Sequence, residues 1–339
     1  MSWQQRLVEQ WQQPRPGALL LALRPLAWVY GALAAAHRAL YASGLRRARR
    51  APRPVIVVGN LVAGGAGKTP AVIALVEQLR ALGRRPGVLS RGHGRQDDGV
   101  RLVSRDSTAD AVGDEPLLIH LRTGVPVAVG RDRVAAAEAL CAAFADIDLL
   151  IADDGLQHLA LQRELQILVF DDRGAGNHQL LPAGPLRQPM PDSLPERTLV
   201  LYSHGVQSTP LPGALGERRL AGFTPLADWW NGAAPQAAAL DALRARPLLA
   251  AAGLARPEPF FRMLEALGLR IGRMALPDHA RFDALPWPAS TPDVIVTEKD
   301  AVKLRPDAVG TTRVWVATLD FRLPPDFGRN VLDRLEGSR

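Results

Sequence analysis

Cysteine and lysine are scarce in this chain of 339 residues. The single cysteine, Cys141, excludes an internal disulfide framework and any zinc site built on cysteines, and it fits a reducing compartment. Only Lys68, Lys299 and Lys303 are lysines among 41 basic residues. Such a composition indicates a bias that replaces lysine with arginine at positions where either residue is suitable. Lysine then persists at positions that need a compact ammonium group. We therefore single out these three positions.

Acidic residues are nearly absent from residues 1–53, which hold nine arginines and only Glu9 and so carry +8. Because the whole chain carries +7, the other 286 residues carry −1. A near-neutral body argues against a nucleic-acid-binding protein, and the basic segment predicts a local anionic partner. The apolar fraction of 47% and charged fraction of 22% exclude disorder for the bulk of the chain.

Residues 17–36 are apolar and long enough to span a membrane, but Arg24 and Pro25 lie in their middle. A central arginine costs about 2.5–3.5 kcal/mol on insertion scales, and proline interrupts helical hydrogen bonding. A signal peptide is not favoured, because the basic start is poor and no clean small-residue cleavage site follows. The surrounding arginines and aromatic residues favour a helix or helical hairpin on a cytoplasmic membrane surface, or alternatively a helix packed on the protein's own core. These residues are Arg6, Arg15, Arg24, Arg38, Arg46, Arg47, Arg49, Arg50 and Arg53, with Trp3, Trp11, Trp28, Tyr30 and Tyr41.

A β-branched run at 54–58 is followed by a glycine-rich turn and an amphipathic helix that ends at Gly83. Strand, glycine turn, Lys-Thr and helix form the context of a P-loop, whose backbone amides and helix N-terminus bind phosphate. Lys68 is predicted to reach the β- and γ-phosphates, and the Thr69 hydroxyl to bind Mg²⁺. Val62 stands where the strict motif has glycine. The predicted phosphate-binding residues are Val62, Ala63, Gly64, Gly65, Ala66, Gly67, Lys68 and Thr69.

An apolar strand at 148–152 ends in Asp153 and Asp154, which is typical of the Walker B site of a parallel sheet. Both carboxylates are candidate Mg²⁺ ligands, directly or through water. His158 follows, and it is either a phosphate or aspartate contact or a surface residue.

Candidates for the general base are Asp114 and Glu115 in the string GDEP, although Asp114 is equally suited to cap a helix. Arg133 follows a short strand and either clamps an anion or caps a helix. Arg187, at the end of the irregular segment 176–189, is a candidate anion contact. The string TEKD at 297–300 lacks the asparagine of a GTPase, and Ala63 replaces the lysine of a partition-type ATPase.

Strands and helices restart beyond residue 195, with a Pro/Gly-rich stretch at 203–236 and strands at 247–253, 293–304 and 312–319. The sequence therefore predicts an α/β protein with a P-loop-type parallel sheet covered by helices on both faces, a second smaller α/β lobe and an N-terminal membrane-associating helix. The predicted segments are 1–50, 51–200 and 201–339. His279, next to Asp278 in a polar loop, is a candidate cleft residue.

Eight strings in this order resemble the tetraacyldisaccharide 4'-kinase (lipid A 4'-kinase) family, and they cover most of residues 15–304. They are GNLVAGGAGKTP, LSRGHGR, GDEP, DDGLQH, LLPAGPLR, AGLARPEPFF, PDHARF and TEKDAVKL. The resemblance implies transfer of the ATP γ-phosphate to the 4'-hydroxyl of a lipid A disaccharide 1-phosphate, at the cytoplasmic face of a bacterial inner membrane. It implies ATP and Mg²⁺ as cofactors and anionic lipids as partners, with no nucleic acid and no obligate protein partner.

The resemblance also implies roles for individual residues. Asp114 would be the base and His279 its partner, able to take up the proton that Asp114 accepts. The remaining residues would surround Mg-ATP or the acceptor: Asp153, Asp154, Gln157, His158, Arg133 and Arg187. His93 stands where the family usually has tyrosine. The alternative function is a membrane-associated P-loop ATPase switch, for which GDEP and PDHARF have no obvious use.

Overall fold

The structure is a computed structural model that describes residues 3–13, 17–95, 97–282 and 284–337. The chain forms two compact units, each assembled from segments that are separate in sequence. Unit 1 comprises Met1–Leu89, Arg133–Glu217 and Leu323–Arg339, and unit 2 comprises Ser90–Asp132 and Arg218–Arg322. The three-segment organisation with boundaries at 50 and 200 stays a prediction.

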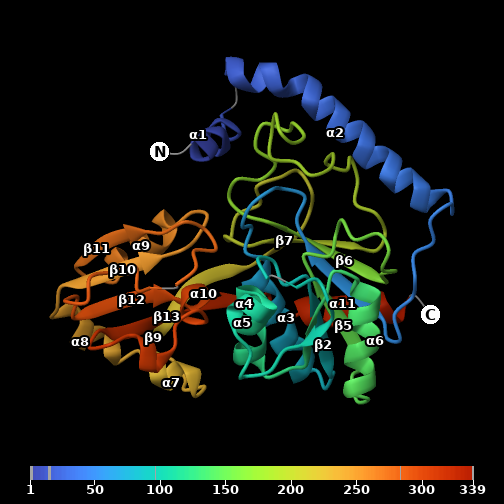
Figure 1. Ribbon diagram of the computed structural model, residues 1–339. Coiled ribbons are helices and arrows are strands. Elements are labelled where there is room, and N and C mark those ends of the chain that lie inside the picture. The colour runs from blue at the N-terminus through green and yellow to red at the C-terminus, as the bar shows by residue number, and fades with distance from the viewer. Residues whose placement is uncertain (1–2, 14–16, 96, 283, 338–339) are drawn as a thin grey trace. The chain divides into compact units, whose positions relative to one another are not determined.

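Unit 1 is built on a parallel sheet with the strand order β2-β5-β1-β6-β7-β8. Figure 1 labels strands β2, β5, β6 and β7 of this sheet. Its central strands β1 and β5 are buried at every residue, as parallel strands covered on both faces are. The P-loop therefore leaves β1 at the same edge of the sheet where β5 ends in Asp153. Its elements are α1 (Trp3–Gln10), α2 (Ala18–Ala42), β1 (Val55–Gly59), α3 (Lys68–Ala81), β2 (Pro86–Ser90), α6 (Arg133–Ala143), β5 (Leu149–Asp153), β6 (Leu165–Phe170), β7 (Thr198–Tyr202), β8 (Ala214–Leu215) and α11 (Phe327–Glu336).

Unit 2 contains a second sheet with the order β11-β10-β12-β13-β9, in which β11, β10, β12 and β13 pair in parallel. Phe223, Phe261, Leu264 and Ile295 are buried in one apolar core beside this sheet. Its elements are β3 (Arg101–Leu102), α4 (Ala109–Val112), α5 (Asp114–Thr123), β4 (Val127–Val129), β9 (Glu217–Pro225), α7 (Leu226–Trp230), α8 (Ala239–Arg244), β10 (Leu248–Ala252), α9 (Glu258–Ala266), β11 (Ile271–Ala275), β12 (Asp293–Thr297), α10 (Glu298–Ala301), a 3₁₀ turn (Pro306–Ala308) and β13 (Arg313–Arg322).

One detail of the predicted second lobe was wrong. The strand predicted at 293–304 ends at Thr297, because the Thr297 hydroxyl accepts a hydrogen bond from the Asp300 amide and caps α10. The Pro/Gly-rich stretch 203–236, for which no element was predicted, contains β8, β9 and α7. Pairing at the edge of a sheet tolerates such residues, so local composition did not reveal these strands.

Helix α2 is one continuous helix that runs through Pro25, so the residues described do not form a hairpin within it. By length and composition it is apolar enough to cross a membrane, and only 11% of its most apolar window is buried. Leu26, Trp28 and Leu33 are 58%, 71% and 67% exposed. These three side chains are exposed, whereas one face of the helix does pack on the protein, because Leu20 is buried in an apolar cluster with Leu7 and Trp11. Arg15 and the side chains of Trp3 and Arg6 lie outside the described residues.

Candidate active site

The P-loop connects β1 to α3 through two glycines with left-handed backbone, Gly64 (φ 97°) and Gly67 (φ 81°). Gly67 is the N-cap of α3, so the helix begins at Lys68 and directs its amide groups toward the loop. Three side chains fix the loop by donating to its carbonyls: Asn60 to Gly64 at 3.2 Å, Arg173 to Gly65 at 3.0 Å and Ser203 to Ala66 at 2.9 Å.

The segment 176–189 is held beside the start of the P-loop. The Ala63 amide donates to the Pro185 carbonyl at 2.7 Å, and the Arg187 amide donates to the Leu61 carbonyl at 2.7 Å. Val62 forms a bridge to Leu186 in the same ladder. The Ala63 amide is therefore already engaged, and it could donate to a phosphate only after releasing the Pro185 carbonyl.

The contacts between the segment 176–189 and the P-loop place Arg187 beside the acidic residues at the end of β5. The guanidinium of Arg187 lies 3.1 Å from Asp154 and donates to Gln157 at 3.3 Å, and Lys68 lies 3.6 Å from Asp154. Burial raises the pKa of Asp154, but Lys68 and Arg187 outweigh it, so its pKa lies below the ordinary value and the carboxylate is ionised. Lys68 also donates to Asn60 at 3.2 Å.

The backbone at Asp154 is left-handed, with φ 48°. His279 (φ 57°) and His178 are the other non-glycine residues with positive φ in the described part of the chain. Such conformations cost of order 1–3 kcal/mol and concentrate at functional sites. That two of the three are predicted site residues supports a functional role for Asp154 and His279.

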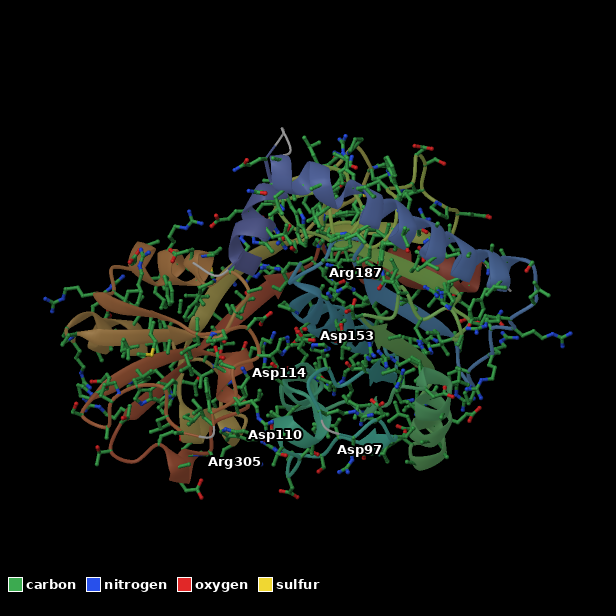
Figure 2. All side chains as sticks on the ribbon, turned by 45° about the horizontal axis from the view of Figure 1, so that its top comes forward. Asp97, Asp110, Asp114, Asp153, Arg187 and Arg305 are labelled. Atoms are coloured by element: carbon green, nitrogen blue, oxygen red, sulfur yellow. The ribbon has the colours of Figure 1, made fainter. Side chains whose placement is uncertain are left out.

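The oxygen donors at this end of the sheet suit Mg²⁺. Asp153, labelled in Figure 2, is the last residue of β5 and is 1% exposed, and Thr69 lies in the first turn of α3. Among the described residues no group of three His, Cys, Asp or Glu side chains holds a metal by itself. A Mg²⁺ ion bound by Thr69, Asp153 and Asp154 would therefore complete its shell with phosphate oxygens and water, as it usually does in kinases.

Three further residues predicted to contact the nucleotide have different surroundings. The Gln157 side chain donates to the Asn60 carbonyl at 3.4 Å and so joins the Lys68–Asp154 cluster. His158 is partly buried, and its carbonyl accepts from Arg163 at 3.3 Å. Arg133 is 3% exposed at the first residue of α6. The roles of His158 and Arg133 stay predictions.

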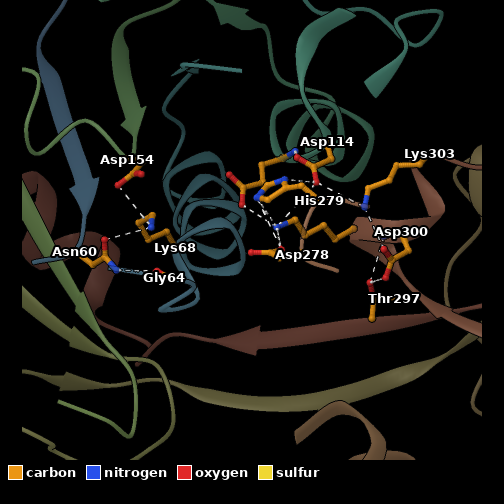
Figure 3. A network of polar contacts seen from close by, with 12 residues as sticks. Asn60, Gly64, Lys68, Asp114, Asp154, Asp278, His279, Thr297, Asp300 and Lys303 are labelled. Atoms are coloured by element: carbon orange, nitrogen blue, oxygen red, sulfur yellow. Dashed lines mark hydrogen bonds and ion pairs between the residues drawn. The ribbon is translucent and has the colours of Figure 1, made fainter. Parts of the chain in front are cut away.

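Unit 2 brings Asp114 and His279 together. Oδ2 of Asp114 lies 3.0 Å from Nδ1 of His279, and Asp114 is 5% exposed (Figure 3). Asp114 is the first residue of α5, and Gly113 occupies the N-cap position. The predicted alternative of Asp114 as the helix cap is therefore wrong, because Gly113 holds that position. Oδ1 of Asp114 accepts from the Glu115 amide at 3.0 Å, while Oδ2 faces the histidine, and the role of Asp114 as the base stays a prediction.

Glycine at 113 is required by this geometry. Its φ is 93°, and a Cβ there would lie 2.9 Å from Cα of Gly92. The segments 91–94 (RGHG) and 113–116 (GDEP) therefore contact each other at Gly92 and Gly113. They also bring the His93 ring within 5.3 Å of the His279 ring, in an edge-on arrangement.

Two lysines complete this cluster. Lys299 and Lys303 lie 4.0 and 3.9 Å from Oδ2 of Asp114. Burial raises the pKa of Asp114, but the hydrogen bond from His279 and the two ammonium groups lower it further, so Asp114 is ionised. The hydrogen bond to Asp114 raises the pKa of His279 above its ordinary value.

Each of the chain's three lysines forms an ion pair with a carboxylate of a candidate site. Lys68 faces Asp154, and Lys299 and Lys303 face Asp114. The scarcity of lysine was therefore a clue that Lys299 and Lys303 lie at a candidate site. Their local sequence did not indicate what surrounds them. Sequence reasoning missed the residues that hold the P-loop carbonyls from outside the motif: Asn60, Arg173 and Ser203.

Comparison with known proteins decides between the kinase and the alternatives. The family described as Tetraacyldisaccharide-1-P 4'-kinase matches residues 19–336. The chain belongs to this family. A tetraacyldisaccharide 4'-kinase from Methylibium petroleiphilum is 57% identical over 95% of this chain and 90% of that protein. Another from Leptothrix cholodnii is 53% identical over 98% of this chain and 97% of that protein.

A solved structure of the family shares the fold. The enzyme LpxK from Aquifex aeolicus, described as an "apo" form in complex with ATP, superposes with a TM-score of 0.76 at 27% identity. The match covers 94% of this chain and 99% of that chain. Membership in the tetraacyldisaccharide-1-P 4'-kinase family and the α/β fold are thus confirmed.

Proposed function

We propose that the protein transfers the γ-phosphoryl group of ATP to the 4'-hydroxyl of a tetraacyldisaccharide 1-phosphate, giving the 1,4'-bisphosphate of lipid A biosynthesis. As a member of the tetraacyldisaccharide-1-P 4'-kinase family it is a kinase, and its relatives carry the name of this activity. The observation that carries the proposal is the buried, ionised Asp114 paired with His279 in a chain that also holds a formed P-loop. An ATPase switch needs no such base.

The nucleotide half of the reaction falls to unit 1. The α3 N-terminus and the P-loop amides bind the phosphates of ATP, and Lys68 exchanges its contacts with Asn60 and Asp154 for phosphate oxygens. Mg²⁺, held by Thr69, Asp153 and Asp154, would neutralise charge on the β- and γ-phosphates. Arg187, already beside Asp154, supplies a further cation there.

The acceptor half falls to Asp114. Its carboxylate accepts the proton of the 4'-hydroxyl as the oxygen attacks the γ-phosphorus, while the bond from that phosphorus to the β–γ bridging oxygen breaks and releases ADP. His279 holds the carboxylate in place through the contact at 3.0 Å. Neutral His279 leaves Asp114 a stronger base than the imidazolium would, because a full positive charge stabilises the ionised carboxylate.

Helix α2 supports an encounter with the lipid at a membrane surface. Several of its apolar side chains are exposed, among them Leu26, Trp28 and Leu33, and basic residues of the first 53 positions flank it. Each basic residue near an anionic leaflet contributes about 1 kcal/mol. We infer a peripheral protein at the cytoplasmic face of the inner membrane, bound to anionic lipids and needing neither nucleic acid nor an obligate protein partner.

The test of this function is label transfer in mixed micelles. ATP labelled in the γ-phosphate is incubated with the disaccharide 1-phosphate or with its 4'-O-methyl derivative. We expect labelled lipid only from the acceptor with a free 4'-hydroxyl. ATP turnover without labelled lipid from either acceptor would favour the ATPase switch instead.

A further inference from the structure

Helix α2 packs one stripe of its side chains on the protein, while most of its other side chains are exposed. Leu20 and Ala27 are buried, and Tyr30, Ala34 and Tyr41 are partly buried. Successive members of this set are three, four or seven residues apart, the spacing that brings side chains to one face of a helix. Both tyrosines of α2 therefore face the protein.

The Tyr30 hydroxyl reaches the segment 176–189, which carries Arg187. It donates a hydrogen bond to the Arg187 carbonyl at 2.9 Å. The next residue, Gly31, lies so close to the same segment that a Cβ there would be 2.7 Å from Cδ1 of Leu180. A close backbone approach and a hydrogen bond thus connect the middle of α2 to two points of the segment.

Trp11 makes a second connection between the N-terminal helices and this segment. Its indole Nε1 donates to the Pro182 carbonyl at 3.1 Å, and its own carbonyl accepts from the Asn177 amide at 2.8 Å. The Trp11 side chain is 8% exposed and lies in one apolar cluster with Leu20 of α2. Since the segment also bonds to the start of the P-loop, it contacts the P-loop and the N-terminal helices at once.

The backbone of Arg187 is held on both sides of its Cα. Its amide donates to the Leu61 carbonyl at 2.7 Å, and its carbonyl accepts from Tyr30. These two bonds fix the peptide planes that flank the Cα, and so they fix the direction in which the side chain starts. The guanidinium then lies 3.1 Å from Asp154 and 3.3 Å from Gln157. An arginine has many rotamers, so a defined position at the nucleotide site depends on such support.

We propose that Tyr30 is a positioning residue for phosphoryl transfer, which fixes the Arg187 carbonyl and thereby keeps the Arg187 guanidinium beside Asp154. The proposal rests on the proposed function, in which Arg187 supplies a cation to the phosphates. Helix α2 then has two separable roles. Its exposed residues Trp28 and Leu33 serve membrane binding, whereas the partly buried Tyr30 supports the nucleotide site.

Tyr41 offers a matched control on the same helix. It is also partly buried, and its ring packs edge-on against the His37 ring with the centroids 5.3 Å apart. Among the contacts of the described residues, no hydrogen bond involves the Tyr41 hydroxyl, whereas that of Tyr30 bonds to Arg187. Tyr30→Phe and Tyr41→Phe therefore remove the same atom from one face of α2, and both keep the ring and its packing.

The kinetic test measures label transfer in mixed micelles by Tyr30→Phe, Tyr41→Phe, Arg187→Ala and the double variant Tyr30→Phe, Arg187→Ala. We expect Tyr30→Phe to lower kcat by about two- to tenfold, the effect of one net hydrogen bond. Its kcat and kcat/KM should fall together, because the cation stabilises charge that develops in the transition state. Tyr41→Phe should keep the wild-type kcat, and all four variants should bind anionic vesicles as the wild type does.

The double variant separates positioning from a general structural effect. If the Tyr30 hydroxyl acts through Arg187, its removal should change kcat by less than about twofold once the Arg187 side chain is gone. An equal fold loss in the presence and absence of the Arg187 side chain would overturn the proposal. A wild-type kcat in Tyr30→Phe would overturn it as well.

A second readout does not depend on activity. The ¹⁵N–¹H signal of the Arg187 Nε group, assigned with Arg187→Ala, reports the surroundings of the guanidinium. We expect this signal to move in Tyr30→Phe and to stay in place in Tyr41→Phe. A signal that is unchanged in Tyr30→Phe would overturn the proposal. If the wild type labels no lipid, the proposed function fails, and the Nε signal still decides whether Tyr30 positions Arg187.

Discussion

Replacing Arg122 with leucine should destabilise the protein because it strips the cation from a buried carboxylate. Nη1 of Arg122 lies 2.7 and 2.6 Å from the two oxygens of Glu298, which is 6% exposed at the start of α10. Removal of one partner from a buried pair costs about 3–5 kcal/mol. The lower figure applies here, because Trp229 Nε1 and the Leu319 amide still donate to Glu298 at 3.2 and 3.1 Å.

Thermal unfolding measures this cost. About 3 kcal/mol corresponds to a fall in Tm of roughly 6–12 °C for a unit of 150–250 residues. The matched control is Arg131→Leu, which breaks an ion pair to Asp98 whose side chains are 69% and 73% exposed. Exposed pairs contribute between about 0 and 1 kcal/mol, so its Tm should shift by no more than a few degrees.

The pH dependence of the destabilisation has a definite sign. Burial raises the pKa of Glu298 above its ordinary value in spite of Arg122, and without Arg122 the pKa rises further. Ionisation of Glu298 therefore costs stability as pH rises from its unfolded toward its folded pKa. The loss caused by Arg122→Leu should be largest near pH 8 and shrink toward pH 5. A loss independent of pH, or one no larger than that of Arg131→Leu, would refute the reasoning, and Glu298→Gln should restore part of the stability of Arg122→Leu.

Three further predictions concern the metal, the membrane and the glycine turn. Chelation with EDTA should abolish label transfer, and excess Mg²⁺ should restore it; transfer that persists in EDTA would contradict a metal at Thr69 and Asp153. The double variant Trp28→Ser, Leu33→Ser should reduce co-sedimentation with anionic vesicles by at least about tenfold, because both side chains are exposed on α2; unchanged binding would contradict a membrane-facing helix. Gly113→Ala should lower the free energy of unfolding by about 1–3 kcal/mol in a urea titration, because its φ is 93° and the new Cβ meets backbone at 2.9 Å; wild-type stability would contradict the turn.

Local sequence chemistry predicted those parts of the molecule that depend on neighbours in the chain. The β-branched run before the P-loop became β1, and the amphipathic segment after it became α3. The same reasoning extended the strand at 293–304 too far, because the hydroxyl of Thr297 ends it through a single capping bond. Apolar periodicity does not carry information about such a bond.

Local sequence patterns could not predict contacts between residues that lie far apart in the chain. The ion pair of Arg122 and Glu298 joins residues 176 positions apart, and the P-loop carbonyls are held by Arg173 and Ser203 from distant loops. The pairing of Asp114 with His279 was expected only through family resemblance, and the structure brings them to 3.0 Å. Only the fold determines these distances.

The most direct test of the central claim is label transfer from ATP to the disaccharide 1-phosphate by Asp114→Asn. The amide keeps the shape of the side chain and removes its ability to accept the hydroxyl proton. We predict that kcat falls by about 10²–10⁴-fold while ATP affinity, measured separately by calorimetry, stays near that of the wild type. A kcat equal to that of the wild type would contradict the assignment of Asp114 as the base.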